Sequence, residues 1–116
     1  MSSLDPTLTP LARFKICAAL NAFSAVESDP QGGAPSKEMK FAKLRDATEL
    51  SNASLSKHLG ALEQVGYITR FREYGSTRAK DTVWVMLTAA GSAAFQSHWA
   101  ALRELVERPG PGSGAD

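Results

Sequence analysis

The sequence has few of the side chains that bind metals or form cross-links. Its 116 residues include one cysteine, Cys17, and only two histidines, His58 and His98. A single cysteine cannot form an intramolecular disulfide, and these residues lack the spacing of a usual zinc site. We therefore expect no metal, no cofactor and a reducing compartment.

Long hydrophobic runs are also missing. No apolar run approaches the 18 residues that a membrane-spanning helix needs, and the opening MSSLDPTLTP lacks the basic and apolar pattern of a secretory signal. These two absences predict a soluble cytoplasmic protein with no membrane partner.

Catalytic patterns are absent as well. The sequence shows no recognisable set of nucleophile, base and orienting residue, and no glycine-rich phosphate loop after a strand. We therefore expect a protein that is not an enzyme.

The net charge is small, but positive residues are concentrated in the middle of the chain. The net charge is +1, yet residues 37–80 hold nine Lys or Arg against five Asp or Glu, and the remainder holds four against seven. A chain of this length, 43% hydrophobic, suits one domain with one core. The basic middle points to an acidic partner.

Hydrophobic periodicity and turn residues predict a mostly helical α+β fold. The expected domain spans residues 10–107, between an N-terminal arm at 1–9 and a disordered tail at 108–116. Helices are expected at residues 10–25, 42–50, 53–65 and, after the cap residue Thr88, up to 107. Strands are expected at residues 39–41, 67–73 and 82–87, the last two forming a hairpin, and a loop at 27–38.

Two short helices joined by a tight turn and followed by a basic hairpin are typical of a winged helix-turn-helix. In the 53–65 helix, Leu55, Leu59 and Leu62 define the inward side, and small residues lie opposite. Gly60 costs on the order of 1 kcal/mol against Ala inside a helix, which close approach to another surface would explain. We expect this outer side to enter the major groove of double-stranded DNA.

Candidate DNA contacts lie on the recognition helix and on the hairpin. The helix supplies Asn52, Ser54, Ser56, Lys57, His58 and Gly60, and the hairpin supplies Arg70, Arg72, Arg78 and Lys80. The alternative for the serines and Lys57 is an ordinary solvated helix start, and for the hairpin a solvated charged ribbon. His58 either packs and forms hydrogen bonds within the protein or contacts a phosphate.

Apolar residues exceed what a small core needs, which predicts a homodimer with a closed two-fold interface. The interface candidates lie on the first and last helices: Leu11, Phe14, Phe95, Trp99, Leu102 and Val106. The alternative places all of them in the core of one chain.

The segment FAKLRDATELSNASLSKHLGALEQVGYI, the basic hairpin after it and then VMLTAAGSAAF resemble bacterial winged-helix regulators of the MarR and ArsR type. The opening LDPTLTPLARFKICAAL is similar to the first helix of small MarR-like members. This resemblance implies a homodimer that sets two recognition helices in successive major grooves and usually represses transcription.

Two departures accompany the resemblance. The paired-cysteine motif of metal-sensing ArsR-type proteins is absent from LRDATEL, so metal sensing is not expected. The chain is also shorter than typical MarR proteins, and the sequence identifies no small-molecule effector. The alternative function is a winged-helix module that binds proteins without DNA, which would favour an apolar or acidic helix face over a basic one.

Overall fold

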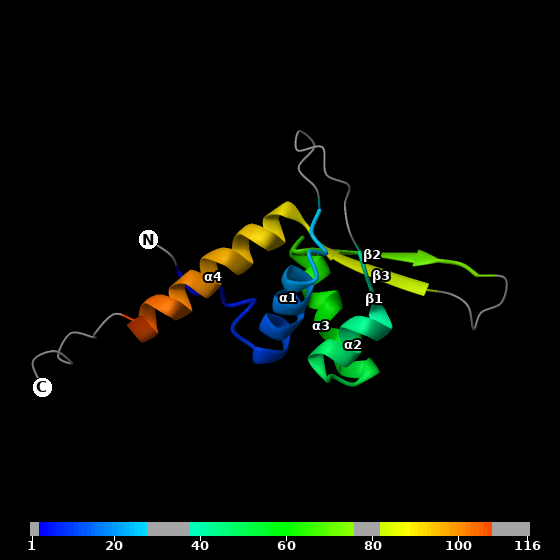
Figure 1. The fold of residues 1–116 in the computed structure, drawn as a ribbon, viewed down its shortest axis with the longest axis horizontal. Coiled ribbons are helices and arrows are strands. Elements are labelled where there is room, and N and C mark those ends of the chain that lie inside the picture. Colours follow the sequence, from blue (N-terminus) through cyan, green and yellow to red (C-terminus); the bar gives the residue numbers. More distant parts are fainter. Residues whose placement is uncertain (1–2, 28–37, 76–81, 108–116) are drawn as a thin grey trace, which may run out of the picture.

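The structure is a computed structural model that describes residues 3–27, 38–75 and 82–107. These residues form four helices and one three-stranded antiparallel sheet (Figure 1). The elements in chain order are α1 (Leu11–Ala22), β1 (Met39–Lys40), α2 (Phe41–Thr48), α3 (Asn52–Gln64), β2 (Ile68–Glu73), β3 (Thr82–Leu87) and α4 (Ala89–Glu107). The predicted mostly helical α+β class is confirmed. The predicted disordered tail at 108–116 and most of the predicted loop lie outside the described residues.

Helix α1 ends three residues earlier than the sequence predicts. Ser24 takes a left-handed conformation with φ of 62°, which breaks the helix after Ala22. The chain then runs beside the end of β3, where Leu87 N donates to Ala25 O and Glu27 N donates to Leu87 O. This pairing with a distant strand overrides the local helical pattern.

The two short helices α2 and α3 meet at a tight turn, as expected. Glu49 ends α2 in the left-handed region with φ of 59°, and its N–H donates to Arg45 O. Ser51 then caps α3 by accepting a hydrogen bond from Ser54 N at 3.1 Å. Each helix therefore has a local stop or start signal at the turn.

The sheet has the order β1-β3-β2, which adds a third strand to the predicted hairpin. The two residues of β1 pair with β3, and Phe71 of β2 lies opposite Trp84 of β3. Phe71, Trp84 and Lys40 consequently share one side of the sheet, because directly paired residues face the same way. Arg70, Val85 and Met39 share the other side.

One hydrophobic core joins the four helices to the sheet. Its largest fully buried side chains are Leu8, Ile16, Leu20, Leu44, Leu55, Leu59, Leu62, Ile68 and Leu87. Cys17 lies in this core, where burial and the negative charge of Asp5 raise the pKa of its thiol to about 12. The thiol is therefore protonated at neutral pH and acts as a small core side chain.

The N-terminal residues 3–9 pack against the body of the domain. Leu8 is fully buried, and the carboxylate of Asp5 accepts a hydrogen bond from Tyr67 Oη at 2.6 Å. The backbone N–H of Asp5 donates to Nδ1 of the buried His98 at 2.8 Å. This segment, called the arm below, thus links α4 to the residue before β2.

The start of α4 packs directly on the backbone before β2. Thr88 Oγ1 accepts from Gly91 N at 2.9 Å, which confirms Thr88 as the cap residue, and donates to Gly66 O at 2.6 Å. A Cβ atom at Gly91 would lie 1.9 Å from Tyr67 O. Only glycine fits this contact between helix and backbone.

We expect Gly91→Ala to lower the free energy of unfolding by about 2 kcal/mol or more, since a backbone oxygen cannot move aside. Urea denaturation measures the change. Gly60→Ala is the matched control, because a Cβ there would lie 4.0 Å from Arg70 Nη2, an ordinary contact. The control is expected to keep or raise stability, and equal losses in both variants would contradict the close-packing argument.

The contact between Tyr67 and Asp5 predicts a loss of stability at alkaline pH. The hydrogen bond to Asp5 and burial raise the pKa of Tyr67 to about 12. The protonated phenol therefore contributes fully to the free energy of unfolding below the unfolded pKa of about 10, and this contribution is lost as pH rises through 12. Tyr67→Phe should flatten this part of the stability profile, measured by urea denaturation at several pH values. The exposed Tyr74 provides the control variant Tyr74→Phe.

Candidate nucleic-acid interface

Helix α3 has one buried side and one exposed side. Leu55, Leu59 and Leu62 are fully buried, as the spacing predicts. The opposite side is exposed and carries only short side chains and two longer polar ones: Ala53, Ser56, Lys57 and Gln64. We call these four residues the outer face of α3. It is narrow enough for a major groove about 12 Å wide.

The turn before α3 contains a contact that the sequence did not predict. Arg45 Nη1 on α2 donates to Asn52 Oδ1 at 3.0 Å. This bond connects the two short helices and occupies the oxygen of Asn52, which leaves its Nδ2 group as the donor toward an external acceptor. Asn52 is exposed, as a DNA-contacting residue must be.

The sequence predicted that Gly60 lies on the open outer side of α3, and the structure differs. It is half-buried, and the guanidinium of Arg70 lies beside it. Arg70 donates to Glu63 Oε1 from Nη2 at 2.8 Å and from Nε at 3.3 Å. The protein therefore covers this part of α3 with its own wing, meaning residues 68–75 and 82–87, and an alanine at position 60 would fit the same contact.

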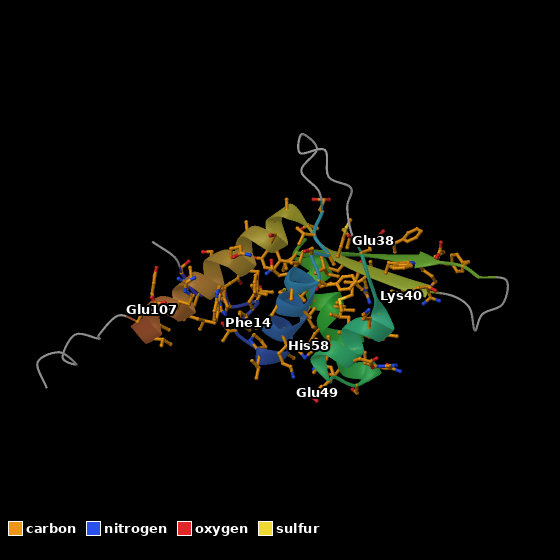
Figure 2. All side chains as sticks on the ribbon, in the orientation of Figure 1. Phe14, Glu38, Lys40, Glu49, His58 and Glu107 are labelled. Atoms are coloured by element: carbon orange, nitrogen blue, oxygen red, sulfur yellow. The ribbon has the colours of Figure 1, made fainter. Side chains whose placement is uncertain are left out.

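His58 forms a hydrogen bond within the protein, which was one of the two alternatives. Its Nδ1 accepts from Arg13 Nε on α1 at 3.2 Å, and the side chain lies in the packed region between α1 and α3 (Figure 2). Burial and the positive charges of Arg13 and Lys57 lower the pKa of His58 below 6.5. A neutral imidazole is therefore favoured at neutral pH.

The wing carries two arginines on one side and aromatic residues with Glu73 on the other. Arg72, like Arg70, lies on β2 and is exposed. Arg78 and Lys80, also predicted to contact DNA, lie outside the described residues. On the other side Phe71 is 57% exposed and lies opposite Trp84, whose Nε1 donates to Glu73 at 3.4 Å.

One group of exposed apolar residues lies on α1 and α4. Leu11 is 69% exposed, Trp99 42% and Val106 86%. With the half-buried Phe14 and Leu102, these three residues define what we call the terminal apolar surface. A cavity of about 270 Å³ opens between the arm, α1 and α4 beside it.

Phe95 differs from the other predicted interface residues. It is only 6% exposed and packs on Phe14, with the ring centroids 5.4 Å apart. The prediction for Phe95 is therefore corrected: it belongs to the core of one chain, because α4 turns this side toward α1. Leu4 on the arm and Leu105 on the last turns of α4 are also exposed, although the sequence pattern did not indicate either of them.

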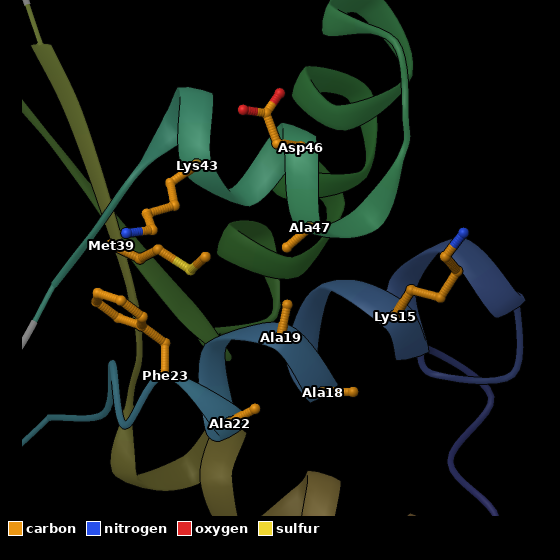
Figure 3. A pocket seen from close by; sticks show the side chains of 9 residues that line it. All are labelled: Lys15, Ala18, Ala19, Ala22, Phe23, Met39, Lys43, Asp46 and Ala47. Carbon is orange, nitrogen blue, oxygen red and sulfur yellow. The ribbon is translucent and has the colours of Figure 1, made fainter.

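A separate open groove of about 800 Å³ lies between α1 and α2 (Figure 3). Alanines from both helices form much of its lining, with Phe23 and Met39 at one end and Lys15 at the other. Lys43 lies over the Phe23 ring, 5.4 Å from its centroid. The lining residues come from α1, β1 and α2 and include none of the outer face of α3.

The described residues show neither a metal-binding cluster nor a membrane-spanning helix. Within residues 3–27, 38–75 and 82–107, no three His, Cys, Asp or Glu side chains gather as a metal site would require. None of the helices in these ranges combines the length and the apolar character needed to cross a membrane.

A family model described as winged helix DNA-binding domain matches residues 34–106. The chain belongs to this family. The match covers both short helices, the sheet and almost all of α4, so it includes every element of the candidate interface. No curated protein sequence matches the chain.

Solved structures of transcriptional regulators share the fold. A transcriptional regulator homologue from Pyrococcus horikoshii aligns with a TM-score of 0.69 at 15% identity over 87% of this chain and 85% of that one. PcaV from Streptomyces coelicolor, solved with its natural ligand, aligns with a TM-score of 0.63 at 12% identity, over 90% of this chain and 62% of PcaV. MarR from E. coli aligns with a TM-score of 0.56 at 19% identity, over 94% of this chain and 76% of MarR. At these identities the likeness establishes the winged helix fold.

The cap at Ser51 predicts a contribution to stability from the start of α3. Ser51→Ala should lower the free energy of unfolding by about 1 kcal/mol, because Ser54 N loses its acceptor. Ser51→Asp keeps an acceptor and should remain near the wild-type value. Urea denaturation of both variants measures the difference, and equal stability of Ser51→Ala and wild type would contradict the role of the cap.

Proposed function

We propose that the protein is a sequence-specific transcriptional regulator that binds double-stranded DNA as a homodimer. The observation that carries this proposal is the narrow outer face of α3, which is exposed beside a basic wing in a winged helix domain. A helix of this shape enters a major groove, and the wing then lies over the adjacent backbone.

The outer face offers hydrogen-bond donors more than acceptors. Lys57, the Nδ2 group of Asn52 and the hydroxyl of Ser56 are exposed on or beside it. Donors of this kind suit phosphate oxygens and the acceptor atoms of guanine in the major groove. Arg72, and in the sequence Arg78 and Lys80, would add phosphate contacts from the wing.

Groups that already form bonds within the protein narrow the list of DNA contacts. Arg70 is paired with Glu63, and Ser54 N is bonded to the cap residue Ser51. We therefore place Lys57 and Ser56 in the centre of the interface and assign Arg70 to holding the wing against α3.

The homodimer is supported by the terminal apolar surface. Exposed Leu11, Trp99 and Val106 would bring a large apolar area into contact with water in a monomer, and a two-fold interface between copies buries it on both. The surface lies on α1 and α4, so an interface there leaves the outer faces of both α3 helices free for two half-sites on DNA.

Repression in the bacterial cytoplasm is the expected outcome of such binding, because a dimer on a promoter excludes other proteins from it. The resemblance to MarR-type regulators supports this part of the proposal. The α1–α2 groove is an open site of about 800 Å³, and no effector is assigned to it.

The rival function is a winged-helix module that binds another protein without DNA. The exposed Phe71, which lies opposite the half-buried Trp84 on the wing, favours it, since aromatic residues are enriched in protein interfaces. The outer face of α3 favours DNA, because it carries Lys57 and no exposed large apolar side chain. DNA binding therefore remains the proposed function.

Lys57→Ala should weaken binding to a specific duplex about tenfold, roughly 1.4 kcal/mol. It should also lower the slope of log K against log salt by about 0.9, the value of one phosphate contact. Arg78→Ala should act in the same way. Fluorescence anisotropy with labelled duplex at several salt concentrations measures both quantities.

The control for these variants is Arg103→Ala on α4, whose side chain pairs with Glu107 far from α3. It removes the same charge and should leave affinity near the wild-type value. The duplex comes from selection of tight binders out of random DNA with purified protein. A two-fold symmetric consensus supports the dimer, and binding that does not weaken with added salt contradicts the proposal.

Leu11→Asp should convert the dimer to a monomer, because it places a charge in the terminal apolar surface. Analytical ultracentrifugation measures the mass, and anisotropy should show weaker binding to the two-fold consensus. Phe71→Asp is the matched control for the mass, since it places the same charge on another exposed apolar side chain outside the terminal apolar surface. A wild-type protein that is monomeric at every concentration tested would overturn the dimer.

A further inference from the structure

Arg13 contacts two segments that are far from each other in the sequence. From its position on α1, its Nε donates to Nδ1 of His58 on α3, at 3.2 Å, and its Nη1 donates to the carbonyl of Thr7 in the arm, at 3.4 Å. One guanidinium thereby joins the arm, the first helix and the recognition helix. Both bonds run to neutral acceptors, so neither is an ion pair.

The arm end of this connection is held firmly. Thr7 N donates to Asp5 Oδ1 at 2.8 Å, and Asp5 is in turn bonded to Tyr67 and His98. These bonds fix the carbonyl of Thr7 relative to α4 and to the residue before the wing. Arg13 therefore has a rigid anchor on the side opposite His58.

The other end determines the proton arrangement of His58. An imidazole that accepts at Nδ1 carries its proton on Nε2, and the lowered pKa favours this neutral form. The charges that face His58 are Arg13 from α1 and Lys57 from its own helix, and both are positive. Protonation at Nδ1 would remove the acceptor and place two cations in contact.

We propose that Arg13 is a positioning residue for DNA recognition, which holds α3 at a fixed angle to α1 and the arm through His58. This inference rests on the proposed function. His58 lies next to Lys57 on α3, so a shift of the His58 side of the helix rotates the outer face that must fit the groove. A misplacement of about 1 Å is sufficient to weaken polar contacts strongly.

Geometry distinguishes this role from a direct contact with a phosphate. The guanidinium of Arg13 is part-buried, and its Nε and Nη1 donate hydrogen bonds to acceptors within the protein. A lysine at this position keeps the charge but has no planar fork that reaches two acceptors in different directions. Arg13→Lys therefore separates positioning from charge.

The experiment compares wild type, Arg13→Lys and Arg13→Gln on a labelled duplex that carries the selected consensus. We expect both variants to bind about tenfold more weakly with an unchanged slope of log K against log salt. If Arg13 instead contacts a phosphate, Arg13→Lys restores binding and Arg13→Gln lowers the slope by about 0.9. That result, or full affinity in both variants, overturns the proposal.

Substitution of His58 tests the other partner of the bond. His58→Asn keeps an acceptor near the position of Nδ1 and should bind close to wild type, whereas His58→Leu should bind as weakly as Arg13→Lys. The double variant Arg13→Lys/His58→Leu should fall no further than either single change, because both remove the same contact. Additive losses would overturn the coupling.

Lys15→Gln is the matched control on α1, since Lys15 lines the α1–α2 groove and makes no bond to α3 among the described residues. It should leave DNA affinity unchanged, and a loss equal to that of Arg13→Gln would overturn the proposal in favour of a general charge effect. Urea denaturation confirms that each variant is folded at the temperature of the assay.

A readout without DNA keeps this inference separate from the proposed function. In ¹⁵N-histidine NMR spectra, wild-type His58 should show an unprotonated Nδ1 and a protonated Nε2, and Arg13→Lys should shift toward a mixture of both forms. If wild type shows this tautomer but binds no duplex, the proposed function fails. If wild type binds duplex and the His58 signals do not respond to Arg13→Lys, the positioning role fails.

Discussion

The burial of three leucines on α3 is the interaction on which the rest of the domain depends. Leu55, Leu59 and Leu62 are fully buried, and each contributes about 1.5–3 kcal/mol relative to an exposed side chain. This stripe determines the rotation of α3 about its own axis. The polar and small residues on the opposite side are thereby presented together, and no separate interaction is needed to expose them.

The leucine stripe alone does not define a surface for DNA, because rotation about one axis leaves the tilt of the helix free. Two polar contacts restrict it from opposite sides. Glu63 binds Arg70 at the base of the wing, and His58 binds Arg13 on α1. The wing and α1 therefore hold α3 between them, and the cost is that Arg70 and part of Gly60 are no longer open to a ligand.

The sequence predicted the elements that depend on local periodicity and turns. The spacing of the leucines predicted α3 and its buried side. Thr88 predicted the start of α4, and the β-branched residues predicted β3. Contacts between residues far apart in the chain were not predictable from these signals. The bond from Arg13 to His58 spans 45 positions and that from Asp5 to His98 spans 93, and no periodicity encodes either.

Helix α1 explains why the two proposed surfaces belong to one compact unit. Its first turn exposes Leu11 on the terminal apolar surface, and its later turns bury Ile16 and Leu20 in the core. Between these positions Arg13 reaches α3. A second copy that packs on Leu11 would press on the same helical turn that holds His58. Dimer formation and the orientation of α3 would then be coupled through a few residues of one helix. Such a coupling acts in both directions, so DNA that selects one orientation of α3 would also favour the dimer.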